Sequence, residues 1–121
     1  MDKIESKNQL IDFISSGEKR IEDFKIGTEH EKFAFKLNDK KPVFYEGEGS
    51  ISELLLKLVN FGWDPIYEND KVIALSRNDK IGGGSITLEP AGQFELSGAM
   101  LNSVHETHDE LLNHKDQISN I

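Results

Sequence analysis

The chain has 121 residues, enough for one small domain, and its 14 basic and 22 acidic residues give a formal net charge of −8. This acidic balance, without any lysine–arginine cluster, argues against nucleic acid or an anionic membrane surface as a partner. The absence of cysteine excludes disulfides, thiolate zinc sites and a cysteine nucleophile within these residues. No apolar run approaches membrane-spanning length and the first residues do not resemble a signal peptide, so we expect a cytoplasmic protein.

The amino-terminal stretch predicts an amphipathic helix. Asp2 and Glu5 form a capping-box-like pair at its start, and Gly17 provides a stop. The apolar residues that recur at helical spacing are Ile4, Leu10, Ile11 and Ile14. We expect this helix to pack against the rest of the domain.

Residues 25–37 predict a strand that carries acidic side chains. Its apolar residues alternate with polar ones, which is the period of a half-buried strand. Glu29 and Glu31 share the parity of the apolar residues Phe33, Phe35 and Leu37. Carboxylates two residues apart on a strand are separated by roughly 6.6 Å and repel by roughly 2.5 kcal/mol at an effective dielectric constant near 20.

Two interpretations of these acids stay open. If the strand is continuous, a cation between the carboxylates relieves their repulsion, and oxygen ligands suit hard ions such as Mg²⁺. If a bulge resets the register, both acids point to water.

The middle of the chain predicts a helix and a hairpin. Ser50 and Glu53 form a capping box that opens a leucine-rich helix, and Gly62 stands where it would end. Residues 63–67 and 71–75 then read as two strands of a hairpin. The glycines at 82–84 fit neither the dinucleotide fingerprint nor the phosphate loop, and indicate a connector.

Residues 85–97 predict a second acidic strand. One parity is apolar and comprises Ile86, Leu88, Phe94 and Leu96. The opposite parity includes Glu89, Gln93 and Glu95, again carboxylates at strand spacing. Because proline cannot donate to a central ladder, residues 90–92 predict a kink or bulge in this strand.

A capping box at Ser103 and Glu106 predicts a last helix. Its apolar positions are Val104, Leu111, Leu112 and Ile118. Three histidines on this helix are interpreted as surface or hydrogen-bonded packing residues: His105, His108 and His114. His30, which lies opposite its flanking glutamates, is interpreted as structural.

Three blocks, residues 26–33, 85–90 and 92–98, closely resemble glutamate–cysteine ligase, in the branch found in plants and many proteobacteria. Their order and spacing fit the family, and the resemblance covers nearly all of the chain from Lys25 onward. One local departure is Ala91, where the family usually carries glycine. A larger one is length, because family members run several-fold longer; residues 1–121 resemble the amino-terminal portion of the catalytic domain.

This resemblance implies an enzyme that uses ATP to join the γ-carboxylate of glutamate to the amine of cysteine, the first step of glutathione synthesis. It implies an α+β fold similar to glutamine synthetase: a curved antiparallel sheet, here incomplete, with helices packed on one face. It further implies that Glu29, Glu31, Glu89 and Glu95 hold Mg²⁺ around the ATP phosphates, and that Gln93 contacts substrate.

Two alternatives are a non-catalytic module that binds metal or an amino acid, and a related ligase that joins glutamate to another amine. An unprotected sheet edge would also invite self-association.

Overall fold

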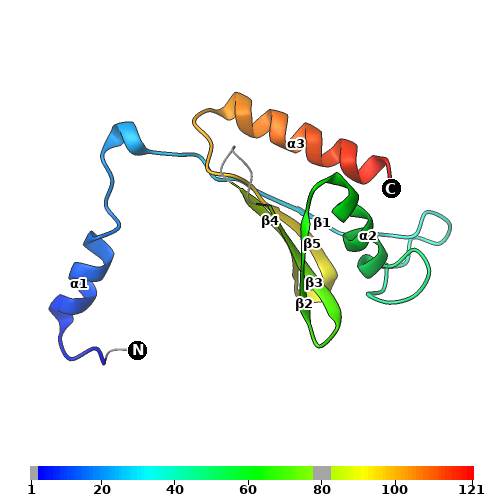
Figure 1. Cartoon of the computed structure of the whole chain (residues 1–121), viewed down its shortest axis with the longest axis horizontal. Coiled ribbons are helices and arrows are strands. Elements are labelled where there is room, and N and C mark those ends of the chain that lie inside the picture. The colour runs from blue at the N-terminus through cyan, green and yellow to red at the C-terminus, as the bar shows by residue number, and fades with distance from the viewer. Residues whose placement is uncertain (1–2, 78–82) are drawn as a thin grey trace.

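The computed structural model describes residues 3–77 and 83–121, and five strands within them form one sheet (Figure 1). The strands pair in the order β1-β5-β4-β3-β2, and every neighbouring pair is antiparallel. Their bounds are Glu29–Lys32 (β1), Asp64–Glu68 (β2), Lys71–Arg77 (β3), Gly84–Glu89 (β4) and Gln93–Ser97 (β5). The predicted α+β class with an antiparallel sheet is confirmed.

Two helices cover one face of this sheet, as predicted: α2 (Ile51–Leu58), which continues as the 3₁₀ turn η2 (Val59–Phe61), and α3 (Val104–Ser119) (Figure 1). The Ser50 side chain caps α2 by accepting from the Glu53 amide, and Gly62, at φ 87°, ends η2. The core joins leucines of α2 to apolar residues of β3, β4 and β5. Its fully buried members are Leu55, Leu58, Leu75, Ile86 and Leu96.

The predicted hairpin of β2 and β3 is confirmed. Asn69 and Asp70 both have positive φ, the conformation that a two-residue hairpin turn requires. Within the described residues, no helix is long and apolar enough to span a membrane. The glycine connector predicted at 82–84 falls partly outside the described residues; Gly84 is the first residue of β4.

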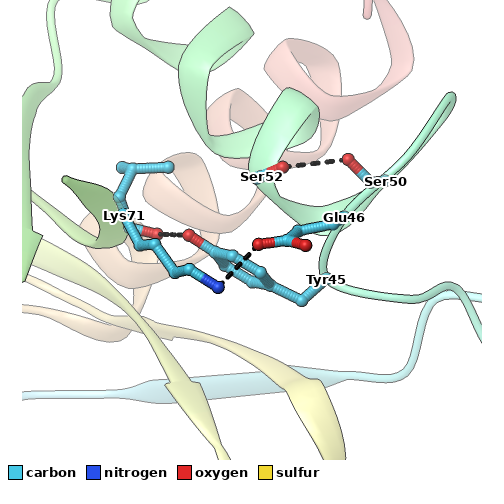
Figure 2. Close-up of polar contacts among 6 residues, drawn as sticks. Tyr45, Glu46, Ser50, Ser52 and Lys71 are labelled. Atoms are coloured by element: carbon cyan, nitrogen blue, oxygen red, sulfur yellow. Dashed lines mark hydrogen bonds and ion pairs between the residues drawn. The ribbon is translucent and has the colours of Figure 1, made fainter. Parts of the chain in front are cut away.

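Figure 2 shows how the segment between β1 and α2 is attached to β3. The Tyr45 hydroxyl donates to the Val72 carbonyl at 2.7 Å, and the Lys71 ammonium pairs with Glu46 at 2.6 Å. The hydrogen bond from Lys71 lowers the pKa of the Glu46 carboxyl. Because exposed ion pairs stabilise little, the half-buried Tyr45 side chain is the principal attachment.

The first helix differs from its prediction. Helix α1 spans Lys7–Ser15 and starts at a capping box of Ser6 with Gln9. Asp2, the predicted cap, lies outside the described residues. None of its residues is buried, and Figure 1 shows it well away from the sheet, with the 3₁₀ turn η1 (Ile21–Asp23) in between. The expected packing is therefore wrong, because helical periodicity reveals an apolar face without revealing whether anything covers it.

The predicted second acidic strand is two strands. Between β4 and β5, the 3₁₀ turn η3 (Pro90–Gly92) reverses the chain, and Glu89 pairs with Gln93 across it. Ala91 and Gly92 adopt positive φ values of 64° and 73°. The expected kink is therefore a full reversal, which proline alone does not reveal.

Replacing Ala91 with glycine should stabilise the protein, because an L-residue with a side chain is strained in the left-handed region. We expect Ala91→Gly to raise the free energy of unfolding by about 1 kcal/mol, measured by urea denaturation. Ala74→Gly, in the middle of β3, is the matched control and should destabilise. A destabilised Ala91→Gly variant would contradict this account of the turn.

Candidate functional site

The acids of β1 lie on the side of the sheet that the helices leave open. Glu29 and Glu31 are exposed, whereas the alternating residues His30 and Lys32 are partly buried. Pairing of β1 with β5 runs through four consecutive residue pairs in register, as the continuous-strand interpretation requires. The strand is nevertheless shorter than residues 25–37: isolated bridges lie on either side of it, and Phe33 and Phe35 are 55% and 53% exposed.

Strand pairing gathers polar residues from all five strands on that same side. Directly opposite residues in an antiparallel pair point to the same face, so each row of partners shares a face. One row crosses the whole sheet, and its members are Glu29, Ser97, Ser85, Ser76 and Asp64. The next two rows are Glu31, Glu95 and Thr87, and then Gln93 with Glu89. We call these ten residues the open face.

The centre of the open face brings two carboxylates into direct opposition. Glu31 on β1 is the cross-strand partner of Glu95 on β5, and Glu95 is only 7% exposed. Neighbouring donors hold both groups: the Ser97 hydroxyl donates to Glu95 at 2.5 Å, and the Gln93 amide donates to Glu31. Like charges directly opposite each other destabilise a sheet, so this pair lowers the stability of the fold.

The other predicted site residues lie on the same face at different distances along it. Glu29 is two residues from Glu31 on β1, and Glu89 lies at the exposed end of β4, where Gln93 is its partner. Sequence patterns did not single out Asp64, Ser76, Ser85 or Ser97, which lie in the same row as Glu29. The alternation within each strand shows which residues share a face of that strand. It cannot show that they share a face with the acids until the strand order and register are known.

The oxygen ligands of the open face fit a hard cation in their chemistry. In the part of the chain that the structure describes, however, no three acidic or histidine side chains converge closely enough to bind one ion together. Mg²⁺ commonly takes one or two carboxylates together with phosphate oxygens and water. The opposed pair contributes two carboxylates to this face.

The histidines separate into exposed and buried positions. His105 and His108 are exposed, and His30 lies within 3.3 Å of the Thr28 hydroxyl, which agrees with a structural role. His114 is only 2% exposed and its ring stacks on Phe94 with centroids 5.9 Å apart. Burial, and secondarily the charges of Lys32 and His30, lower the pKa of His114 to about 4.

The expectation that His114 is hydrogen-bonded is wrong, because neither ring nitrogen has a hydrogen-bond partner among the described residues. The apolar stripe predicted for α3 is also partly wrong. Val104 and Leu112 are exposed, while the buried residues are Thr107, His114 and Gln117.

An antiparallel sheet with helices behind it and a polar, acidic open face defines a small α+β domain. Residues 25–121 match the model of glutamate-cysteine ligase family 2 (GCS2), and the chain belongs to this family.

Relatives include the chloroplastic glutamate–cysteine ligases of Medicago truncatula (46% identical), Arabidopsis thaliana (43%) and Oryza sativa subsp. japonica (ligase A, 43%). Each similarity extends over 114 residues and 93% of this chain, but over 21%, 20% and 22% of the respective relatives. The chain therefore spans about a fifth of the length of these relatives.

The expectation of a cytoplasmic protein is contradicted by these relatives, which are chloroplastic enzymes by name. Composition could not reveal this. An acidic surface without a long apolar run suits any aqueous compartment equally well.

Because His114 is buried and neutral, it should make the stability depend on pH. The unfolded chain takes up a proton on this residue below about pH 6.5, whereas the folded chain resists it until about pH 4, so stability falls as the pH drops through that window. His114→Leu should raise the free energy of unfolding, by about 1 kcal/mol at pH 8 and by more at pH 5. Urea denaturation at both pH values measures this difference.

The exposed His105 provides the matched control: His105→Leu should show no such widening between pH 8 and pH 5. A stability gain of His114→Leu that stays constant or shrinks toward pH 5 would contradict the burial of a neutral imidazole.

Proposed function

We propose that residues 1–121 form the amino-terminal portion of the catalytic domain of an ATP-dependent glutamate–cysteine ligase. The enzyme would join the γ-carboxylate of glutamate to the amine of cysteine, the first step of glutathione synthesis. Family membership and the names of the relatives support this function. In this proposal the sheet continues into a curved, glutamine-synthetase-like funnel, and its edge strands β1 and β2 are where further strands, or a second copy, would pair.

The observation that carries the proposal is the direct opposition of Glu31 and Glu95 on the open face. Opposed carboxylates are costly in a protein that needs only to fold, and useful in one that binds a cation. Glu29, Glu31, Glu89 and Glu95 would hold Mg²⁺, which when bound would neutralise charge on the ATP phosphates. Gln93, hydrogen-bonded to Glu31 and paired with Glu89, would contact substrate from the same row.

In this reaction the protein has to position the substrates and neutralise the charge of the phosphates, and little else. The glutamate γ-carboxylate attacks the γ-phosphorus of ATP, ADP leaves, and the cysteine amine then displaces phosphate from the acyl phosphate. Substrate atoms supply both nucleophiles, so no side chain has to become covalently attached. The hydrogen bonds of Ser97 to Glu95 and of Gln93 to Glu31 orient the carboxylates before any ligand arrives.

Neutralising one member of the opposed pair should have opposite effects on stability and on metal binding. In EDTA, we expect Glu31→Gln to raise the free energy of unfolding by up to about 1 kcal/mol, since the repulsion disappears. Added Mg²⁺ should stabilise the wild-type chain by mass action and stabilise Glu31→Gln much less. Urea denaturation with and without Mg²⁺ measures both effects.

Glu48→Gln, which removes an exposed carboxylate in the segment before α2, is the matched control and should change neither quantity. A Glu31→Gln variant stabilised by Mg²⁺ as strongly as the wild type would remove Glu31 from the metal site.

The catalytic proposal is tested in a chimera in which residues 25–121 replace the matching segment of the Medicago truncatula ligase. The chimera should release phosphate from ATP only when glutamate and cysteine are both present, and Glu31→Gln should lower that rate by about 100-fold. The chain alone should show no cysteine-dependent release above a Glu29→Ala, Glu95→Ala control. A folded chimera that ignores cysteine, or whose activity survives Glu31→Gln, would refute the assignment.

A further inference from the structure

The face of α3 that meets the sheet is unusually polar. Its buried side chains are a hydroxyl, an imidazole and an amide, at Thr107, His114 and Gln117, and Gln117 accepts from the Trp63 indole at 2.9 Å. Helices that only cover a sheet normally present an apolar stripe. A polar inner face indicates that α3 has a second role.

A cavity of about 530 Å³ lies between this face of α3 and the sheet. Trp63, Leu96 and Leu101 form its apolar wall, and Glu110, Asn113 and His114 are among its polar lining on α3. We call it the α3 pocket. An apolar cavity of this size with a few converging polar groups is typical of a small-molecule site.

Two residues that line the α3 pocket carry buried polar atoms without hydrogen-bond partners among the described residues. One oxygen of Glu110 accepts from the Ala99 amide at 2.7 Å, while its other oxygen is buried and has no hydrogen-bond partner among the described residues. The same holds for both ring nitrogens of the nearly buried His114. Leaving such a group unpaired destabilises the folded chain. Glycine at position 98 leaves room for the Glu110 carboxylate, because a Cβ on Gly98 would collide with it.

The charge of the lining selects the kind of ligand. Glu106, Asp109 and Glu110 line the pocket along α3, whereas Arg77, on the opposite wall, lies over the Trp63 ring with its guanidinium 5.4 Å from the centroid. Anions are therefore disfavoured. A bound metal ion is disfavoured too, since no three ligating side chains converge anywhere in the described part of the chain. An ammonium group, with several donors and one charge, suits a carboxylate oxygen and a neutral imidazole.

We propose that the α3 pocket binds a small molecule that carries a primary ammonium on an apolar body, with the ammonium at Glu110 and His114 and the body against Trp63 and Leu96. This site is separate from the open face, because Leu96 and Glu95 project from opposite faces of β5. The proposal does not depend on the ligase reaction.

The wild-type chain tests the proposal directly, because Trp63 is its only tryptophan and lines the pocket. We would titrate the chain with 2-phenylethylamine and with its uncharged counterpart, 2-phenylethanol, and record tryptophan fluorescence. The amine should give a saturable change with at least tenfold higher affinity than the alcohol. Equal affinity for the two compounds, or no saturable change with the amine, would overturn the proposal without the use of any variant.

Glu110→Gln then tests the residue, since the amide oxygen can still accept from the Ala99 amide while the charge is lost. The variant should bind the amine at least tenfold more weakly and keep its affinity for the alcohol, with an unchanged circular dichroism spectrum. Asp116→Asn, on the exposed side of α3, is the matched control and should bind both compounds as the wild type does. A folded Glu110→Gln variant with wild-type preference for the amine would overturn the assignment.

Discussion

The register of β1 on β5, which places Glu31 directly opposite Glu95, is the constraint on which the candidate site depends. A slip of one residue in this pairing would separate the two carboxylates, but it would also move an entire strand's side chains to the other face. Phe94 and Leu96 prevent that slip, because both are 2% exposed and packed in the core beneath the helices. The hydrophobic core thus fixes the position of the acids from the opposite face of the sheet.

Strand β5 consequently serves two environments. Its even-numbered residues, Phe94 and Leu96, support the core and the α3 pocket, while Gln93, Glu95 and Ser97 form the middle of the open face. Such a division is available to an antiparallel sheet with helices on only one side. A small domain can therefore present a polar sheet face and a separate pocket beneath its helices without adding any element.

Features with local causes could be predicted from the sequence. The capping residues Ser50 and Ser103 mark true helix starts, and the β2–β3 hairpin follows its turn residues. What failed depended on tertiary context. Alternation placed Phe33 in the same set as Glu31, but it could not tell that both side chains would be exposed. The reversal at Ala91 was hidden because alanine carries no indication of a positive φ.

The residues of the candidate site also divide into those that local sequence patterns predict and those that depend on tertiary structure. The acids were found because they recur at strand spacing and sit in blocks that resemble a known family, whereas Asp64 and Ser76 joined them only through the strand order. The polar face of α3 was visible as Glu110, His114 and Gln117 at helical spacing, yet polar residues on a helix usually indicate solvent. Only the structure shows that these polar residues of α3 face the sheet and not solvent.

The most direct test of the central claim is a titration of the chain with Mn²⁺ as a paramagnetic substitute for Mg²⁺, followed by line broadening of backbone amide NMR signals. If the opposed carboxylates share a cation, the amides of Glu31, Glu95 and Thr87 should broaden first, and those of α2 should stay sharp. Broadening that begins at the acidic residues of α3, or that is equal over the whole surface, would contradict the account.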